Sequence, residues 1–248
     1  MERWIGKLAV VTGASSGIGA SIAEHLVQRG LRVVGLSRRM ERMENLAERL
    51  QIHSGTLYGI QVDMTKTDDI IRAFERIERE YGPIHILVNS AGIFANTSLI
   101  DGDIKKWRDT FEVNVLGLCT ATKESVASMM KHNIDGHIIH LNSVVGHRPV
   151  DFLGENVYPA SKHAVTALTN SWRNELVKKG TKIKVTSISP GLVKNTEIFE
   201  ASGSEMANVD FGEALTPKDI SEAVLYVLNT PPHVQVHDII LRTTGSDV

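Results

Sequence analysis

The sequence predicts an α/β fold in which helices cover both faces of one doubly wound parallel sheet. Short apolar runs alternate with longer segments of helical period along the chain, and a glycine-rich turn joins the first run to the first helical segment. Alternation of this kind builds βαβ units with parallel strands. No Pro- or Ser-rich linker and no repeat divides the 248 residues, so we expect one domain over residues 1–248.

The expected strands are continuous apolar runs such as Ile86-Leu87-Val88, as strands covered on both faces require. There are about seven, at 7–11, 32–36, 57–62, 85–88, 137–142, 183–189 and 237–241. The helical segments between them repeat apolar residues every three or four positions. They are 17–29, 39–53, 67–81, 103–132, 157–179 and 217–229. Residues 192–216 have no clear period, which indicates a substrate lid.

Composition excludes several classes of function. The net charge of −2 offers no basic surface for nucleic acid. The single cysteine, Cys119, rules out an intramolecular disulfide and fits a reducing compartment. No apolar run approaches the length of a membrane span and no signal peptide is visible, so we expect a cytoplasmic protein. The ten histidines show no spacing typical of a metal site, and we expect no metal.

The glycine-rich turn predicts a dinucleotide site. It follows the first strand and begins the first helix, and a second strand completes the βαβ unit. Glycines there permit positive φ and close approach of the backbone to a ligand, while the helix start offers free N–H groups to a pyrophosphate. A bare tight turn is the alternative. The candidate cofactor residues of this turn are Gly13, Ser15, Ser16, Gly17, Ile18 and Gly19.

The end of the second strand favours NADP(H) over NAD(H). An acidic residue at this place would bind the ribose 2′-hydroxyl, but Ser37 is neutral. Arg38 and Arg39 follow, and guanidinium groups bind phosphate oxygens well. The competing interpretation is that both arginines are solvated residues at the start of the next helix.

Tyr158 and Lys162 form a candidate acid/base pair. They lie four positions apart in a helical segment and so share one face. A phenol has an ordinary pKa of about 10, and a neighbouring ammonium is expected to lower it toward the working range. Tyr158 would then donate a proton to a carbonyl oxygen or accept one from an alcohol. Ser143 can hold the same oxygen by a hydrogen bond.

Together these motifs resemble the short-chain dehydrogenase/reductase family over nearly the whole chain, which implies a Rossmann-like fold. The matching segments, in order, are 12–19, Asp63, 89–92, Asn114, 142–146, 158–162 and 190–191. Within the family, residues 1–4 and 231–236 resemble a subgroup that includes insect farnesol dehydrogenases and a vertebrate 17β-hydroxysteroid-type relative.

The resemblance implies further roles. Lys162 would also contact the nicotinamide ribose, and Asn114 would kink its helix and support a water that leads protons to Lys162. Ser90 replaces the asparagine usual in the family, and the family threonine after the sixth strand falls at either Asn195 or Thr196. The remaining cofactor contacts are expected from Asp63, Met64, Asn89, Ala91, Gly92, Pro190, Gly191, Val193 and Thr196.

The expected activity is NADP(H)-dependent hydride transfer between nicotinamide and a lipophilic alcohol or carbonyl. A farnesol-like isoprenoid alcohol leads, with ketosteroid or general carbonyl reduction next; a non-catalytic dinucleotide sensor is the alternative from another class. The resemblance also implies a homodimer or homotetramer formed through segments 103–132 and 157–179. Apolar loop residues should converge at the carboxyl ends of the strands. The candidate substrate residues are Phe94, Val145, His147, Phe152, Leu153 and Phe199.

Overall fold

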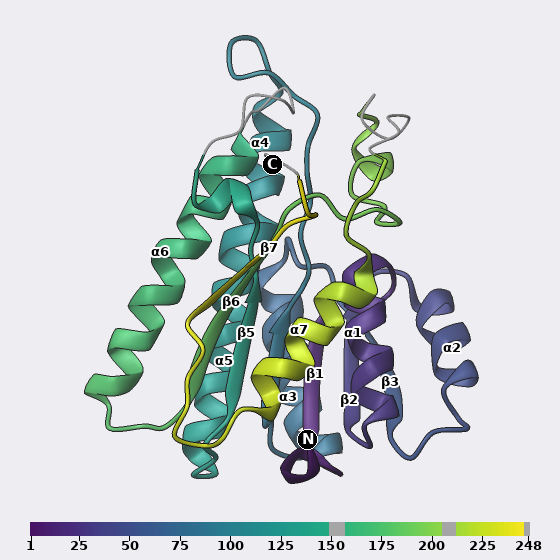
Figure 1. Cartoon of the computed structure of the whole chain (residues 1–248), viewed down its shortest axis with the longest axis vertical. Helices are drawn as coiled ribbons and strands as arrows, with labels where there is room; N and C mark the ends of the chain where they lie inside the picture. The colour runs from purple at the N-terminus through teal and green to yellow at the C-terminus, as the bar shows by residue number, and fades with distance from the viewer. Residues whose placement is uncertain (149–156, 205–211, 246–248) are drawn as a thin grey trace.

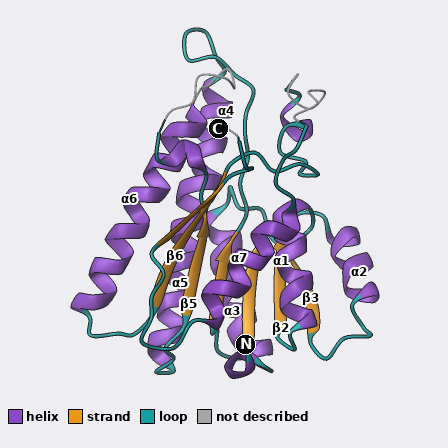
Figure 2. Cartoon of the chain, viewed as in Figure 1, coloured by secondary structure: helices purple, strands orange, loops and turns teal. Residues whose placement is uncertain are grey.

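The protein folds around one seven-stranded parallel sheet, whose strand order is β3-β2-β1-β4-β5-β6-β7 (Figures 1 and 2). The computed structural model describes residues 1–148, 157–204 and 212–245. Every pair of neighbouring strands is parallel. The strands are β1 (Leu8–Thr12), β2 (Arg32–Ser37), β3 (Thr56–Gln61), β4 (Ile86–Asn89), β5 (His137–Leu141), β6 (Lys184–Pro190) and β7 (Asp238–Leu241).

Helices cover both faces of the sheet. On one face lie α1 (Gly17–Gln28), α2 (Met40–Arg49) and α7 (Pro217–Asn229), and on the other lie α3 (Thr67–Tyr81), α5 (Leu118–Lys131) and α6 (Val157–Lys178). The helix α4 (Ile104–Phe111) rises above the carboxyl ends of the strands (Figure 1). This doubly wound arrangement confirms the predicted fold class.

The alternation of side chains in β1 shows why the sheet is covered on both sides. Ala9 and Val11 pack into the core beneath α1, whereas Leu8 and Val10 pack into the core beneath α3. All four side chains are at most 1% exposed. Successive side chains of a strand point to opposite faces, so a strand without polar residues must be buried on both.

The predicted element ends are accurate for strands and less so for two helical segments. Each strand begins and ends within one residue of the expected range. The expected helix 39–53 ends at Arg49, because the chain turns through residues 50–55 to reach β3. The expected helix 103–132 is divided into α4, a π-helical turn η2 (Glu112–Gly117) and α5.

The histidines of β5 are core residues. His140 is fully buried, and its ring nitrogens lie 3.2 Å from the Thr122 hydroxyl and 2.9 Å from the Thr169 hydroxyl. Burial, together with the charges of Arg173 and Lys162, lowers the pKa of His140 to about 3. Within the described residues, no group of three or more His, Cys, Asp or Glu side chains could hold a metal ion. None of the described helices combines the length and the apolar character that a membrane span needs.

Candidate cofactor and active site

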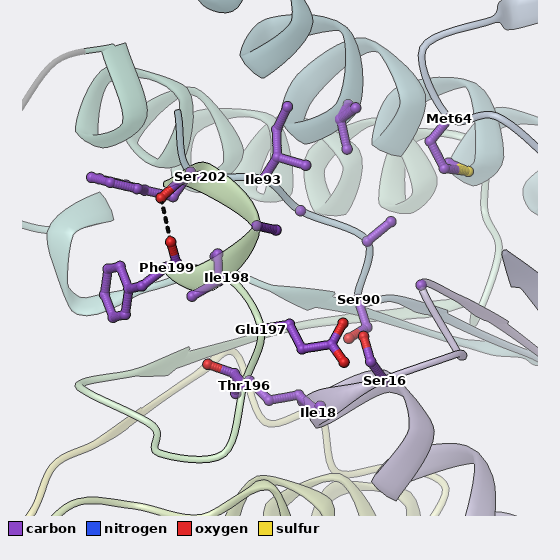
Figure 3. A pocket seen from close by; sticks show the side chains of 18 of the residues that line it. Ser16, Ile18, Met64, Ser90, Ile93, Thr196, Glu197, Ile198, Phe199 and Ser202 are labelled. Atoms are coloured by element: carbon purple, nitrogen blue, oxygen red, sulfur yellow. Dashed lines mark hydrogen bonds between the residues drawn. The ribbon is translucent and has the colours of Figure 1, made fainter. Parts of the chain in front are cut away.

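A large pocket lies at the carboxyl ends of the strands, between the start of α1 and residues 190–202. Its volume is ≈ 580 Å³. The turns that follow β1, β2, β4, β5 and β6 all contribute to its wall, as expected for the ligand crevice of a doubly wound sheet. Figure 3 shows its lining, with Ser16 and Ile18 facing the segment that carries Thr196 and Glu197.

The turn between β1 and α1 is shaped for close approach to a ligand. Gly13 and Gly17 have positive φ values of 70° and 53°, a conformation in which glycine has no steric cost. A Cβ atom on Gly19 would lie 2.3 Å from the Gly13 carbonyl oxygen, so only glycine allows α1 to pack this closely.

The start of α1 fits an anion. The N-cap residue Ser16 makes no side-chain hydrogen bond that would cap the helix. The first N–H groups of a helix have no partner within the helix and carry its positive dipole end. Because they face the pocket beside two serine hydroxyls, the residues present fit a pyrophosphate.

The end of β2 and the two residues after it place a neutral side chain and two cations in the wall of the same pocket. Ser37, Arg38 and Arg39 all line it. The Ser37 hydroxyl accepts a hydrogen bond from the Arg39 backbone N–H at 3.0 Å. The Arg39 guanidinium donates to the Ser16 hydroxyl at 2.7 Å and to the Ser15 hydroxyl at 3.3 Å.

Asp63 and Met64 line the pocket after β3. The Asp63 carboxylate accepts hydrogen bonds from the Thr65 backbone N–H at 3.0 Å and from the Thr65 hydroxyl at 2.8 Å. Burial raises the pKa of Asp63, but these bonds and the charge of Arg38 outweigh that effect and leave the pKa below its usual value. Asp63 is therefore an acceptor at neutral pH, and its contact with an adenine amino group stays a prediction.

The turn after β4 is fixed by Thr12 at the end of β1. The Thr12 hydroxyl accepts hydrogen bonds from the backbone N–H groups of Ser90 and Ala91, at 3.1 and 3.0 Å. Ala91 and Gly92 line the pocket. Asn89 is not among the lining residues; its buried amide donates to the Thr122 hydroxyl at 2.9 Å and ties β4 to α5.

Tyr158 and Ser143 meet in the pocket. Ser143 follows β5, Tyr158 lies in the first turn of α6, and their hydroxyls are hydrogen-bonded. Burial raises the pKa of Tyr158 to about 12, and the bond to Ser143 acts in the opposite direction. The phenol is therefore protonated throughout the neutral range.

Lys162 lies near the Tyr158 ring, one turn further along α6. The ammonium is 5.7 Å from the centroid of the Tyr158 ring and donates to the Leu141 carbonyl at 2.9 Å. Burial lowers the pKa of Lys162 to about 8. The lowered pKa expected for Tyr158 is therefore not found in this structure, because burial outweighs the opposing effects and raises the pKa above its ordinary value.

Asn114 occupies the π-helical turn η2, where the helix departs from its regular pitch. Its side-chain oxygen accepts from the Ile93 backbone N–H at 2.8 Å, and its amide donates to the Ile93 carbonyl at 2.9 Å and to the Ser161 hydroxyl at 3.1 Å. Asn114 thus joins the pocket wall to α6 one residue before Lys162. Its support of a proton-carrying water stays a prediction.

In the turn after β6, Asn195 and Thr196 are the two candidates for the position at which the family usually has a threonine, and the structure places them differently. Thr196 lines the pocket, as do Pro190, Gly191 and Val193, whereas Asn195 is exposed. Asn195 has a φ of 59°, a left-handed conformation that asparagine tolerates better than most residues. The structure therefore favours Thr196 as the pocket residue.

An aromatic wall stands next to the candidate proton donor. The Phe94 ring packs edge-on against the Tyr158 ring and against the Phe199 ring, each at a centroid distance of 5.5 Å. Phe94 and Val145 are both buried, and both line the pocket. Ile93, Leu192 and Ile198 add apolar surface that the sequence did not single out.

His147 is a proposed substrate residue that does not line this pocket. His147 is exposed, binds the Ser189 hydroxyl through its Nε2 atom at 2.8 Å and is not among the described lining residues. The structure places its ring against Ser189 of β6, and its contact with a substrate stays a prediction. Phe152 and Leu153 lie outside the described residues.

Comparison of the sequence with known protein families gives one match that fits this pocket. A family model described as short chain dehydrogenase matches residues 7–207. The chain belongs to the short-chain dehydrogenase family. The family assignment makes it an oxidoreductase with a dinucleotide-binding Rossmann-like fold.

Individual members of the short-chain dehydrogenase family resemble the chain over almost its full length. Farnesol dehydrogenase of Aedes aegypti is 49% identical over 248 residues, which cover 99% of each chain. Dehydrogenase/reductase SDR family member 11 of Mus musculus is 43% identical over 98% of this chain and 96% of its own. The closed form of a serine dehydrogenase complexed with NADP⁺ superposes with a TM-score of 0.88 at 31% identity, covering 97% of this chain and 96% of its own.

Proposed function

We propose that this protein is an NADP(H)-dependent dehydrogenase/reductase that interconverts a lipophilic alcohol and its carbonyl, with a farnesol-like isoprenoid alcohol as the leading substrate. The observation that carries the proposal is the hydrogen-bonded Tyr158–Ser143 pair beside the aromatic wall of Phe94 and Phe199. A proton donor and an apolar surface at one point of a dinucleotide pocket suit a carbonyl carbon in a hydrophobic molecule.

In the proposed mechanism the bound nicotinamide supplies or accepts the hydride. Tyr158 donates its hydroxyl proton to the carbonyl oxygen during reduction and takes a proton from the alcohol during oxidation. Ser143 donates a hydrogen bond to the same oxygen and stabilises the charge that develops there. Lys162 places a positive charge beneath the phenol, which favours the phenolate as it forms.

The preference for NADP(H) rests on the end of β2. Ser37 is buried and neutral, so no carboxylate is present there to bind a ribose 2′-hydroxyl. Arg38 and Arg39 provide the cations that a 2′-phosphate needs. The serine dehydrogenase that resembles this chain is complexed with NADP⁺.

The substrate class rests on the wall and on the relatives. Ketosteroids and other lipophilic carbonyls would also contact apolar surface of this kind, and they remain the second substrate class. We rank an isoprenoid alcohol first because the relative from Aedes aegypti is named a farnesol dehydrogenase.

A substrate series tests the apolar wall. In Phe199→Ala we expect the KM for farnesol to rise about five- to tenfold, because a partly buried phenyl contributes on the order of 1 kcal/mol to an apolar contact. The KM for a short alcohol such as 2-propanol should change little, since it cannot reach the wall. Steady-state kinetics with NADP⁺ measure both.

Tyr226→Ala is the control for the substrate series, because Tyr226 is an aromatic residue on α7 that is 62% exposed and does not line the pocket. An equal rise in KM for the two alcohols in Phe199→Ala would contradict a lipophilic substrate.

The pH dependence should differ between the two directions. Oxidation requires the Tyr158 phenolate, and with a pKa of about 12 the phenolate fraction rises tenfold per pH unit through the neutral range. Reduction requires the protonated phenol, which is present throughout that range. We therefore expect kcat/KM for oxidation to rise from about pH 6 to about pH 8, and that for reduction to stay level over the same range.

Above the pKa of Lys162, about 8, the ammonium is lost and both rates should flatten or fall. The measurement is kcat/KM against pH with farnesol and with farnesal. A level profile for oxidation would contradict Tyr158 as the group that takes the proton.

The proposed location of the enzyme is the cytoplasm. The single cysteine fits a reducing compartment of this kind.

The proposed assembly is a homodimer or homotetramer. Two apolar side chains, Phe111 at the end of α4 and Leu116 on η2, are 36% and 49% exposed, and a partner subunit would cover this surface. Analytical ultracentrifugation measures the assembly.

A further inference from the structure

Glu197 crosses the pocket and joins its two sides. Its carboxylate accepts a hydrogen bond from the Arg39 guanidinium at 2.6 Å and forms a second ion pair with Arg42. Burial raises the pKa of Glu197, but these two bonds outweigh it and hold the pKa below its usual value. Glu197 is therefore anionic at neutral pH. Figure 3 shows its carboxylate facing Ser16, at the start of α1.

The groups that hold Glu197 are those that would hold a phosphate. Arg39 bonds both the carboxylate and the hydroxyls of Ser15 and Ser16. Guanidinium groups and serine hydroxyls are together a phosphate-binding set. A ribose 2′-phosphate, with nearly two negative charges and three acceptor oxygens, is a stronger ligand for them than one carboxylate.

Glu197 also belongs to a segment that reaches the aromatic wall. Phe199 is two residues further along and packs on Phe94, which packs on Tyr158. The Ser202 hydroxyl donates to the Phe199 carbonyl at 2.6 Å, so the turn that carries Phe199 is closed locally (Figure 3). A change in the position of Glu197 would therefore also move Phe199, which packs on Phe94 next to Tyr158.

We infer that Glu197 determines cofactor specificity by competing with the 2′-phosphate of NADP(H) for Arg39 and Arg42. Binding of NADP(H) displaces the carboxylate and releases residues 196–202, whereas NAD(H) has no group that displaces it. The inference rests on the proposed NADP(H) preference.

Glu197→Gln tests the competition. The change removes the charge and keeps the size of the side chain. We expect the Kd for NADP⁺ to fall about three- to tenfold and the Kd for NAD⁺ to stay within about twofold. Each exposed ion pair favours the blocked state by up to about fivefold in its equilibrium constant. The apparent Kd rises in proportion to the fraction of protein that is blocked, so removing the block lowers it. Isothermal titration calorimetry measures both without any turnover.

Glu200→Gln is the matched control. Glu200 lies three residues away in the same segment, is exposed and forms no ion pair within the described residues. It carries the same change of charge and should leave both Kd values unchanged. Hydrogen exchange of the protein without ligand gives a second readout: residues 196–202 should exchange faster in Glu197→Gln than in Glu200→Gln.

The results separate this inference from the proposed function. Unchanged Kd values in Glu197→Gln overturn it. Weaker binding of both cofactors also overturns it, because Glu197 would then hold the segment closed over any dinucleotide. Adenosine 2′,5′-bisphosphate and adenosine 5′-monophosphate differ only in the 2′-phosphate. Glu197→Gln should bind the first more tightly than the wild type does and the second equally well. That result upholds the inference even if the wild type prefers NAD⁺, in which case the proposed cofactor preference fails by itself.

Discussion

Tyr158→Phe should lower kcat by about 10²–10⁴ in both directions, the loss expected when one positioned acid/base is removed. The substitution deletes only the hydroxyl, so the contact of the ring with Phe94 is kept. Ser143 loses its bond to the phenol but keeps the hydrogen bond from the Val145 backbone N–H at 3.3 Å and its place after β5. Binding of NADP⁺ should be nearly unchanged, since the turn at the start of α1 and the arginines after β2 are untouched.

Single-turnover rates and a calorimetric titration of NADP⁺ measure the two effects on Tyr158→Phe separately. Tyr226→Phe, on the exposed side of α7, loses the same atom far from the pocket and serves as the control. A Tyr158→Phe enzyme that keeps more than half of the wild-type kcat would refute the role of Tyr158. Loss of NADP⁺ binding together with activity would point to a structural role instead.

The second large effect is expected at the adenosine end. Arg38→Ala combined with Ser37→Asp should turn the preference from NADP(H) toward NAD(H). A charge-assisted hydrogen bond contributes roughly 1.5–3 kcal/mol, so the loss of Arg38 should weaken NADP(H) about ten- to a hundredfold. The new carboxylate would repel a 2′-phosphate and accept from a ribose 2′-hydroxyl.

The structure explains why Arg38 is the residue to change. Both arginines line the pocket, and Arg38 can be changed without breaking the Arg39–Glu197 pair, because Arg38 forms no ion pair within the described residues. Arg49→Ala, at the end of α2 and away from the pocket, is the matched control. If titration gives the same ratio of NADP⁺ to NAD⁺ affinity in the double variant and the wild type, both arginines are solvated helix-start residues and the cofactor preference is wrong.

The fold could be predicted because its signals are local. Runs such as Ile86-Leu87-Val88 are apolar at every position, and only a strand covered on both faces uses such a run. The glycine turn before α1 and the spacing of Tyr158 and Lys162 are local too. The helical irregularity at Asn114 was expected only from the family resemblance, because the period of the π-helical turn is close to that of the helices on either side.

The parts of the site that the sequence did not reveal depend on contacts between distant segments. Glu197 meets Arg39 across 158 positions, and no local pattern marks it as a pocket residue. The pKa of Tyr158 depends on how deeply the folded chain buries the phenol and on its hydrogen bond with Ser143. The spacing of four residues correctly predicts that Lys162 lies near the Tyr158 ring. It does not predict that the Leu141 carbonyl accepts the hydrogen bond of the ammonium.

The most direct test of the central proposal follows a hydrogen atom. Farnesol that carries deuterium at its carbinol carbon is incubated with the purified protein and NADP⁺, and both products are analysed by mass spectrometry. We predict equal amounts of farnesal and NADPH, with deuterium in the NADPH, and a rate at least a hundredfold lower in Tyr158→Phe. Farnesol that remains unoxidised, or farnesal formed without deuterium in the reduced cofactor, would contradict the proposed function.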